Sequence, residues 1–502
     1  MYLACEVEDS QSDAEERMNT VTIKPIQDYI AGKFVAPTVD MGKTVHNANT
    51  GEMLAPMMAS SAENVAQALD AAAVAHANGV WSATSLDDRA VWLDKVADHL
   101  MMKVNDIAAV ESINTGIVIS VSGMVNHICH LAFRAAAGVL RSGSLNKRVD
   151  GPHGDVEILD RPLGVAVCIV PWNAPAALAA HKIANALAAG CPTILKPSEW
   201  APFSCQFLAE AIDAVGVPAG VFQLVNGGAE VGAQLVGDKR VRAVSFTGGL
   251  YGGRAVAAAC ALDFKSLQLE LGGNNAMVVL EDADLQTAAT GIVAGMTTLN
   301  GQWCRALGRL IVHESVAVDL LSAALAQLAN VKMGHAMEAD SQLGPLVHDG
   351  HRATVEASVA ALVTQGGIAH QSTPLPSSDA TDGGYWFAPT LISGVPSDAT
   401  LEEIFGPVAA IHTFQTDDEA VALANQTPYG LGGYVYSKDE ARALEIARQM
   451  NTGGVKVNGV SLMELNVDAP RPAWGLSGFG TEGTIETMRV FLGQTVVGVA
   501  GR

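Results

Sequence analysis

Short apolar runs alternate with longer alanine-rich stretches between Leu163 and Glu270. Each run has the length of a buried strand, and turn residues separate it from a segment with helical spacing. Strand–helix alternation at this pace predicts an α/β fold with a parallel, doubly wound sheet. The predicted strands are 165–170, 193–196, 221–225, 243–246 and 266–270.

Polar side chains follow or end these predicted strands. They are Asn173, Lys196, Asn226, Thr247 and Glu270. Ligands of doubly wound sheets bind at the carboxyl ends of the strands. The pattern therefore predicts a nucleotide site along this edge.

The flanking regions have different patterns. From Ser60 the chain is helical in spacing, with a predicted Ser60–Glu63 capping box and then Trp92, Val96 and Leu100 on one face. A second alternating region runs from 275 to 459. Its predicted strands are 276–280, 309–313 and 408–414, and a hairpin over 144–159 and a last strand near 491–500 are expected as well. With 502 residues, two or three domains are expected.

Composition excludes several classes of partner. The net charge of −22 and the pI near 4.9 disfavour nucleic acid and anionic lipid surfaces. The longest charge-free apolar stretch, Leu163–Ala180, is interrupted by PWNAP, so no membrane segment is expected.

The termini and the cysteines indicate the compartment. Residues 1–20 are predicted to be a disordered acidic tail rather than a secretory signal, and Met18 is an alternative start to Met1. The seven cysteines are scattered, odd in number and without metal-type spacing. This usage predicts a reduced, cytoplasmic protein with no metal site.

One glycine loop, FTGGLYGG, stands between a predicted strand and a predicted helix. It is neither a GxGxxG fingerprint nor a phosphate loop ending in Gly-Lys-Ser/Thr. It can be a tight turn, or its backbone N–H groups can meet a pyrophosphate at the helix N-terminus.

A set of motifs carries more specific chemistry. Cys304 lies in LNGQWCRALGR, 34 positions after Glu270 of ELGG. The others are PWNAP with Asn173, HKIANALAAG with Lys182, LKPSE with Lys196 and Glu199, and EEIFGPV with Glu403 and Phe405. In this order and spacing, from Asp28 to Gly483, the chain resembles the NAD(P)-dependent aldehyde dehydrogenase superfamily.

The resemblance implies an aldehyde dehydrogenase-like fold: a doubly wound cofactor domain, an α/β catalytic domain and a small oligomerisation arm. The implied boundaries are 21–140 and 163–272 for the cofactor domain, 273–471 for the catalytic domain, and 141–162 with 484–502 for the bridging arm. Such an arm implies a homodimer or homotetramer.

The resemblance also implies the catalytic residues. Cys304 matches the nucleophile, Asn173 and the Cys304 backbone N–H match the oxyanion donors, and Glu270 matches the base that activates water. Lys182 matches a lysine near the active site. Each has a plainer interpretation: an inert buried thiol, a turn asparagine, a strand-end carboxylate and a helix-surface lysine. The combined spacing favours the catalytic one.

For the cofactor, the resemblance places Lys196 and Glu199 at the adenosine ribose. A carboxylate there accepts hydrogen bonds from ribose hydroxyls and repels a 2′-phosphate, so NAD is preferred and NADP is tolerated. Glu403 matches the residue at the nicotinamide ribose, with Phe405 beside it. Further implied cofactor contacts are Trp172, Thr247, Gly248, Gly249, Gly253 and Leu271. Gly249 replaces the family's usual serine, which leaves more of the phosphate binding to backbone N–H groups.

The substrate is an aldehyde of small-molecule size whose class stays open. The predicted channel residues are Ala174, Leu178, His181, Trp303 and Arg305. Arg305 can clamp a carboxylate, which is typical of a semialdehyde dehydrogenase, or it can be structural and turned away; Trp303 can stack on an aromatic aldehyde. The family's PFGG segment appears as PAWG (Pro472 to Gly475), so the channel shape differs there.

The predicted function is oxidation of an aldehyde to the acid through a cysteine thiohemiacetal and a thioester, followed by hydrolysis. The alternatives are an acyl-phosphate or acyl-CoA reductase of the same fold, and a non-catalytic structural or binding member. Glu270 and the EEIFGPV motif argue against a reductase. The joint presence of Cys304, Glu270 and Asn173 argues against a non-catalytic protein.

Overall fold

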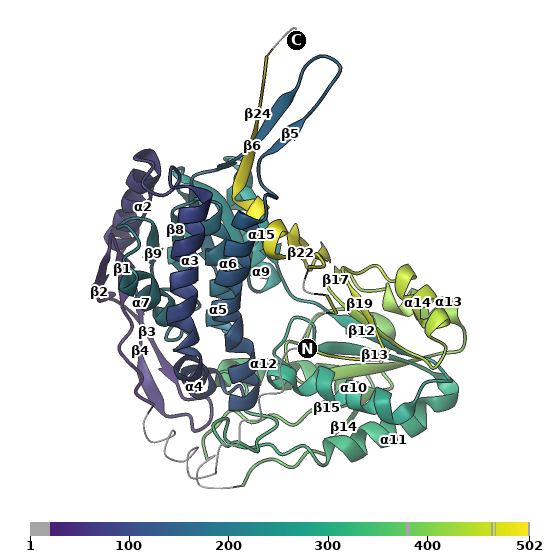
Figure 1. The fold of residues 1–502 in the computed structure, drawn as a ribbon. Coiled ribbons are helices and arrows are strands. Elements are labelled where there is room, and N and C mark those ends of the chain that lie inside the picture. The colour runs from purple at the N-terminus through teal and green to yellow at the C-terminus, as the bar shows by residue number, and fades with distance from the viewer. Residues whose placement is uncertain (1–20, 378–381, 463–464, 467, 500–502) are drawn as a thin grey trace.

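The computed structural model describes residues 21–377, 382–462, 465–466 and 468–499. The predicted tail, 1–20, lies outside the described residues. The chain forms two α/β units built on separate sheets, and a small antiparallel sheet extends away from them (Figure 1).

The first sheet is parallel through its centre, as predicted. Its strand order is β2-β1-β9-β8-β7-β10-β11-β22. The strands are β1 (Asp28–Ile30), β2 (Lys33–Val35), β7 (Val165–Ile169), β8 (Thr193–Lys196), β9 (Phe222–Leu224), β10 (Val241–Thr247), β11 (Ser266–Glu270) and β22 (Gly478–Phe479). The chain proceeds from β7 outward to β9 and then returns to β10 on the other side of β7. The carboxyl ends of β7 and β10 are therefore the topological switch point, where such sheets bind ligands.

Helices cover both faces of this sheet. One layer is α3 (Leu86–Met101), α5 (Ile119–Arg141), α6 (Pro175–Ala188) and α7 (Gln206–Ala214), with α4 (Val104–Thr115) against α5. The other is α2 (Ala62–Ala77), α8 (Ala229–Gly237) and α9 (Leu250–Ala261). The alanine-rich sequence of α6 lets this helix pack with nearly every residue buried. The doubly wound architecture is thus confirmed.

Two details of the N-terminal region differ from the expectation. The cap of α2 is Ser61, whose side chain accepts from the Asn64 N–H, whereas the Ser60 hydroxyl accepts from Asn226 N–H. The predicted Ser60–Glu63 capping box is wrong because a tertiary contact takes Ser60. Strands before α2 were not predicted at all. Besides β1 and β2 they are β3 (Val39–His46) and β4 (Met53–Ala59), an antiparallel pair.

The second sheet has the order β14-β15-β16-β13-β12-β18-β19 and is parallel except at β14. Its strands are β12 (Asn275–Val279), β13 (Leu307–His313), β14 (Ile368–His370), β15 (Thr390–Ser393), β16 (Val408–Phe414), β18 (Gly433–Tyr436) and β19 (Val455–Val457). Its helices are α10 (Leu285–Thr297), α11 (Ala317–Leu328), α12 (Asp349–Thr364), α13 (Asp417–Ala424) and α14 (Glu440–Gln449). Short 3-10 turns occur at Thr298–Gly301, Glu314–Val316 and Ser397–Thr400. The three predicted strands of this region are confirmed within two residues.

The extending sheet consists of β24 (Leu492–Gly498), β6 (Val156–Pro162) and β5 (Lys147–Val149) in that order. The predicted hairpin and last strand pair antiparallel in it (Figure 1). Helix α15 (Thr484–Val490) joins it to four short strands, β17 (Tyr429–Gly430), β20 (Arg471–Pro472), β21 (Trp474–Gly475) and β23 (Thr481–Glu482). The role of the extending sheet in subunit pairing stays a prediction. In the part of the chain that is described, no helix has both the length and the apolarity to cross a membrane.

Candidate active site

The two units meet where the carboxyl ends of β7 and β11 approach the segment before β13. Asn173, just after β7, donates its side-chain N–H to the Gln302 carbonyl at 2.8 Å. Glu403, before β16, accepts from the Gly273 N–H at 2.8 Å. These contacts bring Asn173 and the segment of Cys304 together, although 131 positions separate the two residues (304 − 173).

The segment before Cys304 has an unusual backbone. Leu299, Asn300 and Gly301 all have positive φ, at 49°, 57° and 72°. Non-glycine residues in this region are strained, and such strain persists only where the surroundings hold it. Asn300 supplies the hold: its side chain donates to the Gly116 and Pro345 carbonyls and accepts from the Gly344 N–H. These hydrogen bonds hold the strained segment and so fix the approach of the chain to Cys304.

Cys304 itself is the one partly exposed thiol among the cysteines that the structure describes, whereas the other five are buried. The Asn275 side chain donates to the Cys304 and Ala306 carbonyls, at 2.9 and 2.7 Å. The backbone on both sides of the sulfur is therefore fixed, and part of the surface of Cys304 remains exposed. The interpretation as an inert buried thiol applies to the other described cysteines.

Burial raises the pKa of Cys304 to about 12, and the charge of Arg305 opposes this rise. The negative charges of Glu482, Glu270 and Glu403 add to the rise. The resting group is therefore a thiol at neutral pH, and its attack on a carbonyl requires a base or an added positive charge.

Glu270 ends β11 and has the environment of a general base. Burial, followed by the charge of Glu482, raises its pKa to about 8, while Lys182, Arg305 and Arg471 lower it. Its Oε1 atom is buried and has no hydrogen-bond partner among the described residues. A carboxyl group with a pKa near the working pH and a free oxygen is suited to activating water.

A buried polar network lies behind Glu270. Lys182 donates to the Ser245 hydroxyl at 2.7 Å, and Ser245 donates to Gln268 Oε1 at 2.8 Å. Burial lowers the pKa of Lys182. Its side chain is almost fully buried, so the helix-surface interpretation of Lys182 is wrong.

Glu482 on β23 is a charged site residue that the sequence reasoning missed. Burial favours its protonation, but His181, Arg471 and Lys182 together lower its pKa to about 2. Arg471 Nε donates to its Oε2 at 3.3 Å. Its position in TEG, directly after the SGFG motif, was the available signal.

The predicted cofactor residues gather at the switch point. The Thr247 hydroxyl is buried without a partner in the described protein, and Gly249 caps α9 without a side-chain hydrogen bond. An added Cβ at Gly248 would lie 2.7 Å from the Phe246 ring, and one at Gly253 would lie 2.6 Å from Leu271, so these side chains would have to shift. An orphaned hydroxyl beside an uncapped helix N-terminus fits a phosphate-bearing cofactor.

The remaining cofactor candidates lie on both sides of this point. Lys196 and Glu199 approach at 3.5 Å. Trp172 packs edge-on against Phe405 with ring centroids 5.4 Å apart. Burial raises the pKa of Glu403 to about 7, and a Cβ at Gly272 would collide with its carboxylate. Asn226 does not join them, because its side chain and backbone are bonded to Asp28 and Gln27 in a separate buried cluster.

The predicted channel residues divide into packed and polar ones. Ala174 and Trp303 are buried, and Leu178 packs against the same apolar core as Cys304. His181 hydrogen-bonds to the Thr487 hydroxyl at 3.1 Å, and burial lowers its pKa to about 4, so it is neutral at pH 7. Arg305 is partly buried beside the nucleophile.

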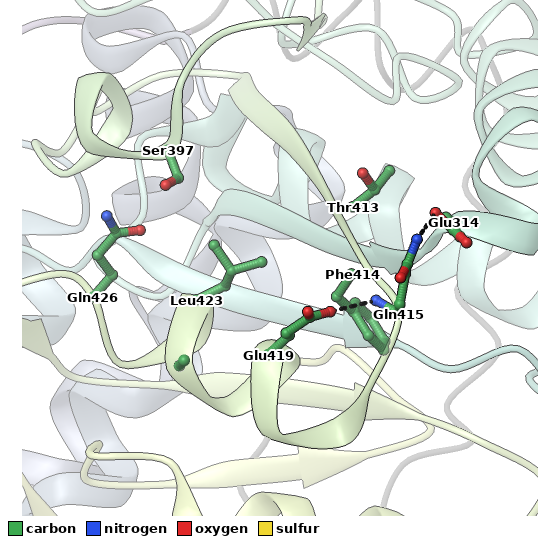
Figure 2. Close-up of a pocket in the computed structure, with 9 residues that line it drawn as sticks. Glu314, Ser397, Thr413, Phe414, Gln415, Glu419, Leu423 and Gln426 are labelled. Atoms are coloured by element: carbon green, nitrogen blue, oxygen red, sulfur yellow. Dashed lines mark hydrogen bonds between the residues drawn. The ribbon is translucent and has the colours of Figure 1, made fainter.

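A hollow of the protein surface lies away from this site. It measures ≈ 640 Å³ and is lined by Glu314, Ser397, Thr413, Phe414, Gln415, Glu419, Ala422, Leu423 and Gln426 (Figure 2). None of the predicted site residues lines it. Its two carboxylates accept hydrogen bonds from Gln415, so they cap local structure.

The Asn173 geometry leads to a first test. Asn173→Ala is expected to lower kcat by about 10²- to 10³-fold, since one oxyanion donor contributes about 3 kcal/mol. The KM for the aldehyde should change little, which steady-state kinetics will show. A loss in kcat below about tenfold would instead indicate that Asn173 only holds the loop through the Gln302 carbonyl.

The pKa of Glu270 leads to a second test. Because Glu270 must be deprotonated to accept a proton, kcat is expected to rise with pH through about 8 and then level off. Glu482→Gln removes a negative charge that raises the pKa of Glu270, so the midpoint should move to lower pH. A pH–rate series with both proteins checks the direction, and a midpoint that stays unchanged would exclude this coupling.

Fold and site together define a two-sheet α/β protein with a nucleotide-type switch point and a cysteine held on a strained segment beside it. The aldehyde dehydrogenase family profile matches residues 34–497. Aminoaldehyde dehydrogenase 1 of Pisum sativum is 34% identical over 92% of this chain and 93% of its own length. Succinate-semialdehyde dehydrogenase of Paenarthrobacter nicotinovorans is 33% identical over 89% and 99%.

Among solved structures, betaine aldehyde dehydrogenase of Staphylococcus aureus in complex with NAD⁺ superimposes with a TM-score of 0.90 at 29% identity, covering 98% of this chain and 97% of that one. The chain belongs to the aldehyde dehydrogenase family and is an aldehyde-oxidising enzyme.

Proposed function

We propose that the enzyme oxidises an aldehyde with NAD and water to the carboxylate, releasing NADH and two protons, with Cys304 as nucleophile. The observation that carries the proposal is the arrangement around Cys304. A partly exposed thiol on a fixed backbone lies beside the Asn173 amide and within electrostatic range of Glu270.

In the first step the Cys304 sulfur attacks the aldehyde carbon, and the thiol proton passes to solvent water as one of the two protons released. The product is a thiohemiacetal whose oxygen carries the negative charge. One Asn173 N–H is used by the Gln302 carbonyl, and the amide's second N–H, with the Cys304 backbone N–H, is available to that oxygen. The fixed segment orients the sulfur without further reorganisation.

After the hydride has left, the thioester is hydrolysed. Glu270, with its free Oε1, takes a proton from the attacking water, and Cys304 leaves as the restored thiol. Lys182 and Glu482 act on Glu270 through their charges, in opposite directions, and so set the pH at which it can accept the proton.

The residues at the switch point suit NAD. Thr247, Gly248, Gly249 and the start of α9 would hold the phosphates. Lys196 and Glu199 would hold the adenosine ribose, where the carboxylate disfavours the 2′-phosphate of NADP. Glu403 would bind the nicotinamide ribose. The bound cofactor supplies the hydride acceptor. The Staphylococcus aureus betaine aldehyde dehydrogenase, whose structure is an NAD⁺ complex, supports this choice.

The rival functions fit the site less well. A reductase of acyl phosphates or acyl-CoA needs no water-activating carboxylate, yet Glu270 is buried with a raised pKa and a free oxygen. A non-catalytic protein has no need for a strained segment that presents a thiol.

We also propose that the protein is cytoplasmic and that it forms a homodimer or homotetramer. The reason for the assembly is that β24 is an edge strand with exposed Val496 and Val497.

The experiment is NADH production by the purified enzyme with aliphatic, aromatic, amino- and carboxy-aldehydes, with NAD and with NADP. Aldehyde-dependent NADH formation with an equal yield of acid is expected, faster with NAD than with NADP. Acid formation that requires coenzyme A or phosphate would contradict the proposal. The relatives' names do not choose the substrate, since they include both aminoaldehyde and semialdehyde enzymes.

A further inference from the structure

Arg305 is a cation next to Cys304 that has no partner among the described residues. It follows Cys304 directly in the chain, is partly buried, and no hydrogen bond or ion pair of its guanidinium occurs within the described residues. Its backbone carbonyl is fixed by the Tyr434 hydroxyl at 2.8 Å. The side chain therefore does not serve to hold the loop, which contradicts the structural interpretation of this arginine.

The guanidinium lies near two glycines that directly precede β18 and β19 of the second sheet. An added Cβ at Gly432 would lie 3.8 Å from Arg305 Nη1, and one at Gly454 would lie 3.7 Å from it. At Gly454 that nitrogen is the one atom within 4 Å of the added Cβ. The glycines leave room around the guanidinium, and its charge reaches both Cys304 and Glu270, whose pKa values it lowers against the effect of burial. The charge of Arg305 thus acts on both groups.

The neighbouring carboxylates do not neutralise Arg305. Glu482 is paired with Arg471 and lies 3.8 Å from His181. Glu403 is bonded to the Gly273 N–H on the cofactor side. Burial and the charge of Glu482 raise the pKa of Glu270 to about 8, so this group is mostly neutral at pH 7. Among the described residues, none of these three carboxylates pairs with Arg305.

Arg471 adds a second guanidinium. It is partly buried on β20, opposite Glu482 of β23. The hydrogen bond that its side chain makes in the described protein uses Nε, which leaves its terminal nitrogens available. Guanidinium groups with free terminal nitrogens bind carboxylates with paired, charge-assisted hydrogen bonds.

We propose that Arg305, assisted by Arg471, forms an anion-binding subsite beside Cys304, and that the preferred substrates are short aldehydes carrying a carboxylate at the far end. The proposal rests on the proposed function and narrows its substrate class. A cationic aldehyde would meet the unpaired guanidinium instead of a counter-ion. Aromatic faces that could bind an ammonium group are also occupied, because Trp303 is buried in the core and Trp172 packs against Phe405 and His351.

The first test compares three aldehydes of equal chain length: succinic semialdehyde, butyraldehyde and 4-aminobutyraldehyde. We expect kcat/KM for the anionic aldehyde to exceed that for the neutral one at least about tenfold, because charge-assisted hydrogen bonds contribute binding free energy of this order. The cationic aldehyde should have the lowest kcat/KM. Oxidation of butyraldehyde at an equal or higher rate would overturn the subsite and leave the proposed function intact. Absence of NADH with all aldehydes would overturn both.

The variant Arg305→Gln separates binding from activation of the thiol. We expect the ratio of kcat/KM for succinic semialdehyde to that for butyraldehyde to fall about 10- to 100-fold, while Arg305→Lys retains part of it. The ratio cancels any effect of Arg305 on Cys304 itself. Arg448→Gln, an exposed arginine on α14, is the matched control and should keep the ratio. An unchanged ratio in Arg305→Gln would contradict the proposal.

A second readout does not depend on turnover. Iodoacetate and iodoacetamide differ in charge but hardly in size, and both alkylate Cys304. The ratio of the alkylation rates of iodoacetate and iodoacetamide at a free thiol in water serves as the reference. We expect mass spectrometry to show a ratio shifted at least about fivefold toward iodoacetate at Cys304, as steering by a local positive charge predicts. Loss of this shift in Arg305→Gln supports the subsite, and its absence in the wild-type enzyme overturns it.

Discussion

Replacement of Cys304 with alanine is expected to abolish aldehyde-dependent NADH formation, with a loss of at least about 10³-fold in kcat. No other described thiol is exposed, so no substitute nucleophile is at hand. The bonds that fix the segment end on the carbonyls of Gln302, Cys304 and Ala306, which alanine retains. The fold and the binding of NAD should therefore persist.

Steady-state NADH formation measures the loss, and a fluorescence titration with NAD verifies the retained site. Cys129→Ala is the matched control: this thiol is buried on α5. The Cys129→Ala variant should be less stable because of the small cavity it creates, and its activity should be unchanged. Substantial activity in Cys304→Ala would contradict the covalent mechanism.

Replacement of Glu270 with glutamine is expected to separate the two halves of the reaction. Hydride departure needs no water, whereas thioester hydrolysis needs a base, so kcat should fall by about 10²- to 10⁴-fold. A burst of NADH of about one per site should remain, since Cys304 and Asn173 are untouched. Stopped-flow absorbance measures the burst, and intact-protein mass spectrometry measures the acyl group on Cys304.

Two additions sharpen this test. Hydroxylamine attacks thioesters without a base and should restore turnover in Glu270→Gln, releasing a hydroxamate. Glu270→Asp keeps the carboxylate and should retain part of the steady-state rate. Loss of the burst itself would contradict the assignment, because it would place Glu270 before hydride departure, as the acceptor of the Cys304 proton.

The strands of both sheets were predictable because each is a short apolar run bounded by turn residues. β8, β11 and β16 begin and end where the pattern predicted them. The strands β1 to β4 were missed, since three of them have exposed or half-buried positions and form only by pairing with another segment. The cap of α2 moved from Ser60 to Ser61 for a related reason: Asn226, 166 positions away, takes the Ser60 hydroxyl.

The site divides in the same way. The spacing of Cys304, Glu270 and Asn173 selected them as catalytic candidates before any coordinates, because the chemistry demands those residue types and the family resemblance supplies their order; their roles stay predictions. Asn275 acts through contacts with a distant segment, of which a single sequence contains no sign, whereas Glu482 had only its position after the SGFG motif as a signal. Asn226, by contrast, satisfied the strand-end pattern and was still drawn into a structural cluster with Asp28.

The amino-acid order alone therefore predicted the doubly wound sheet and the family of the enzyme, and it proposes the nucleophile and its partners. These follow from local periodicity and from motifs whose members are close in sequence or at characteristic spacing. The charge state of each group was decided by the tertiary structure, because burial and neighbours from other segments raise the pKa of Glu270 and leave Arg305 unpaired. Desolvation and Coulomb energies depend on distances in space, and only the folded chain sets those distances.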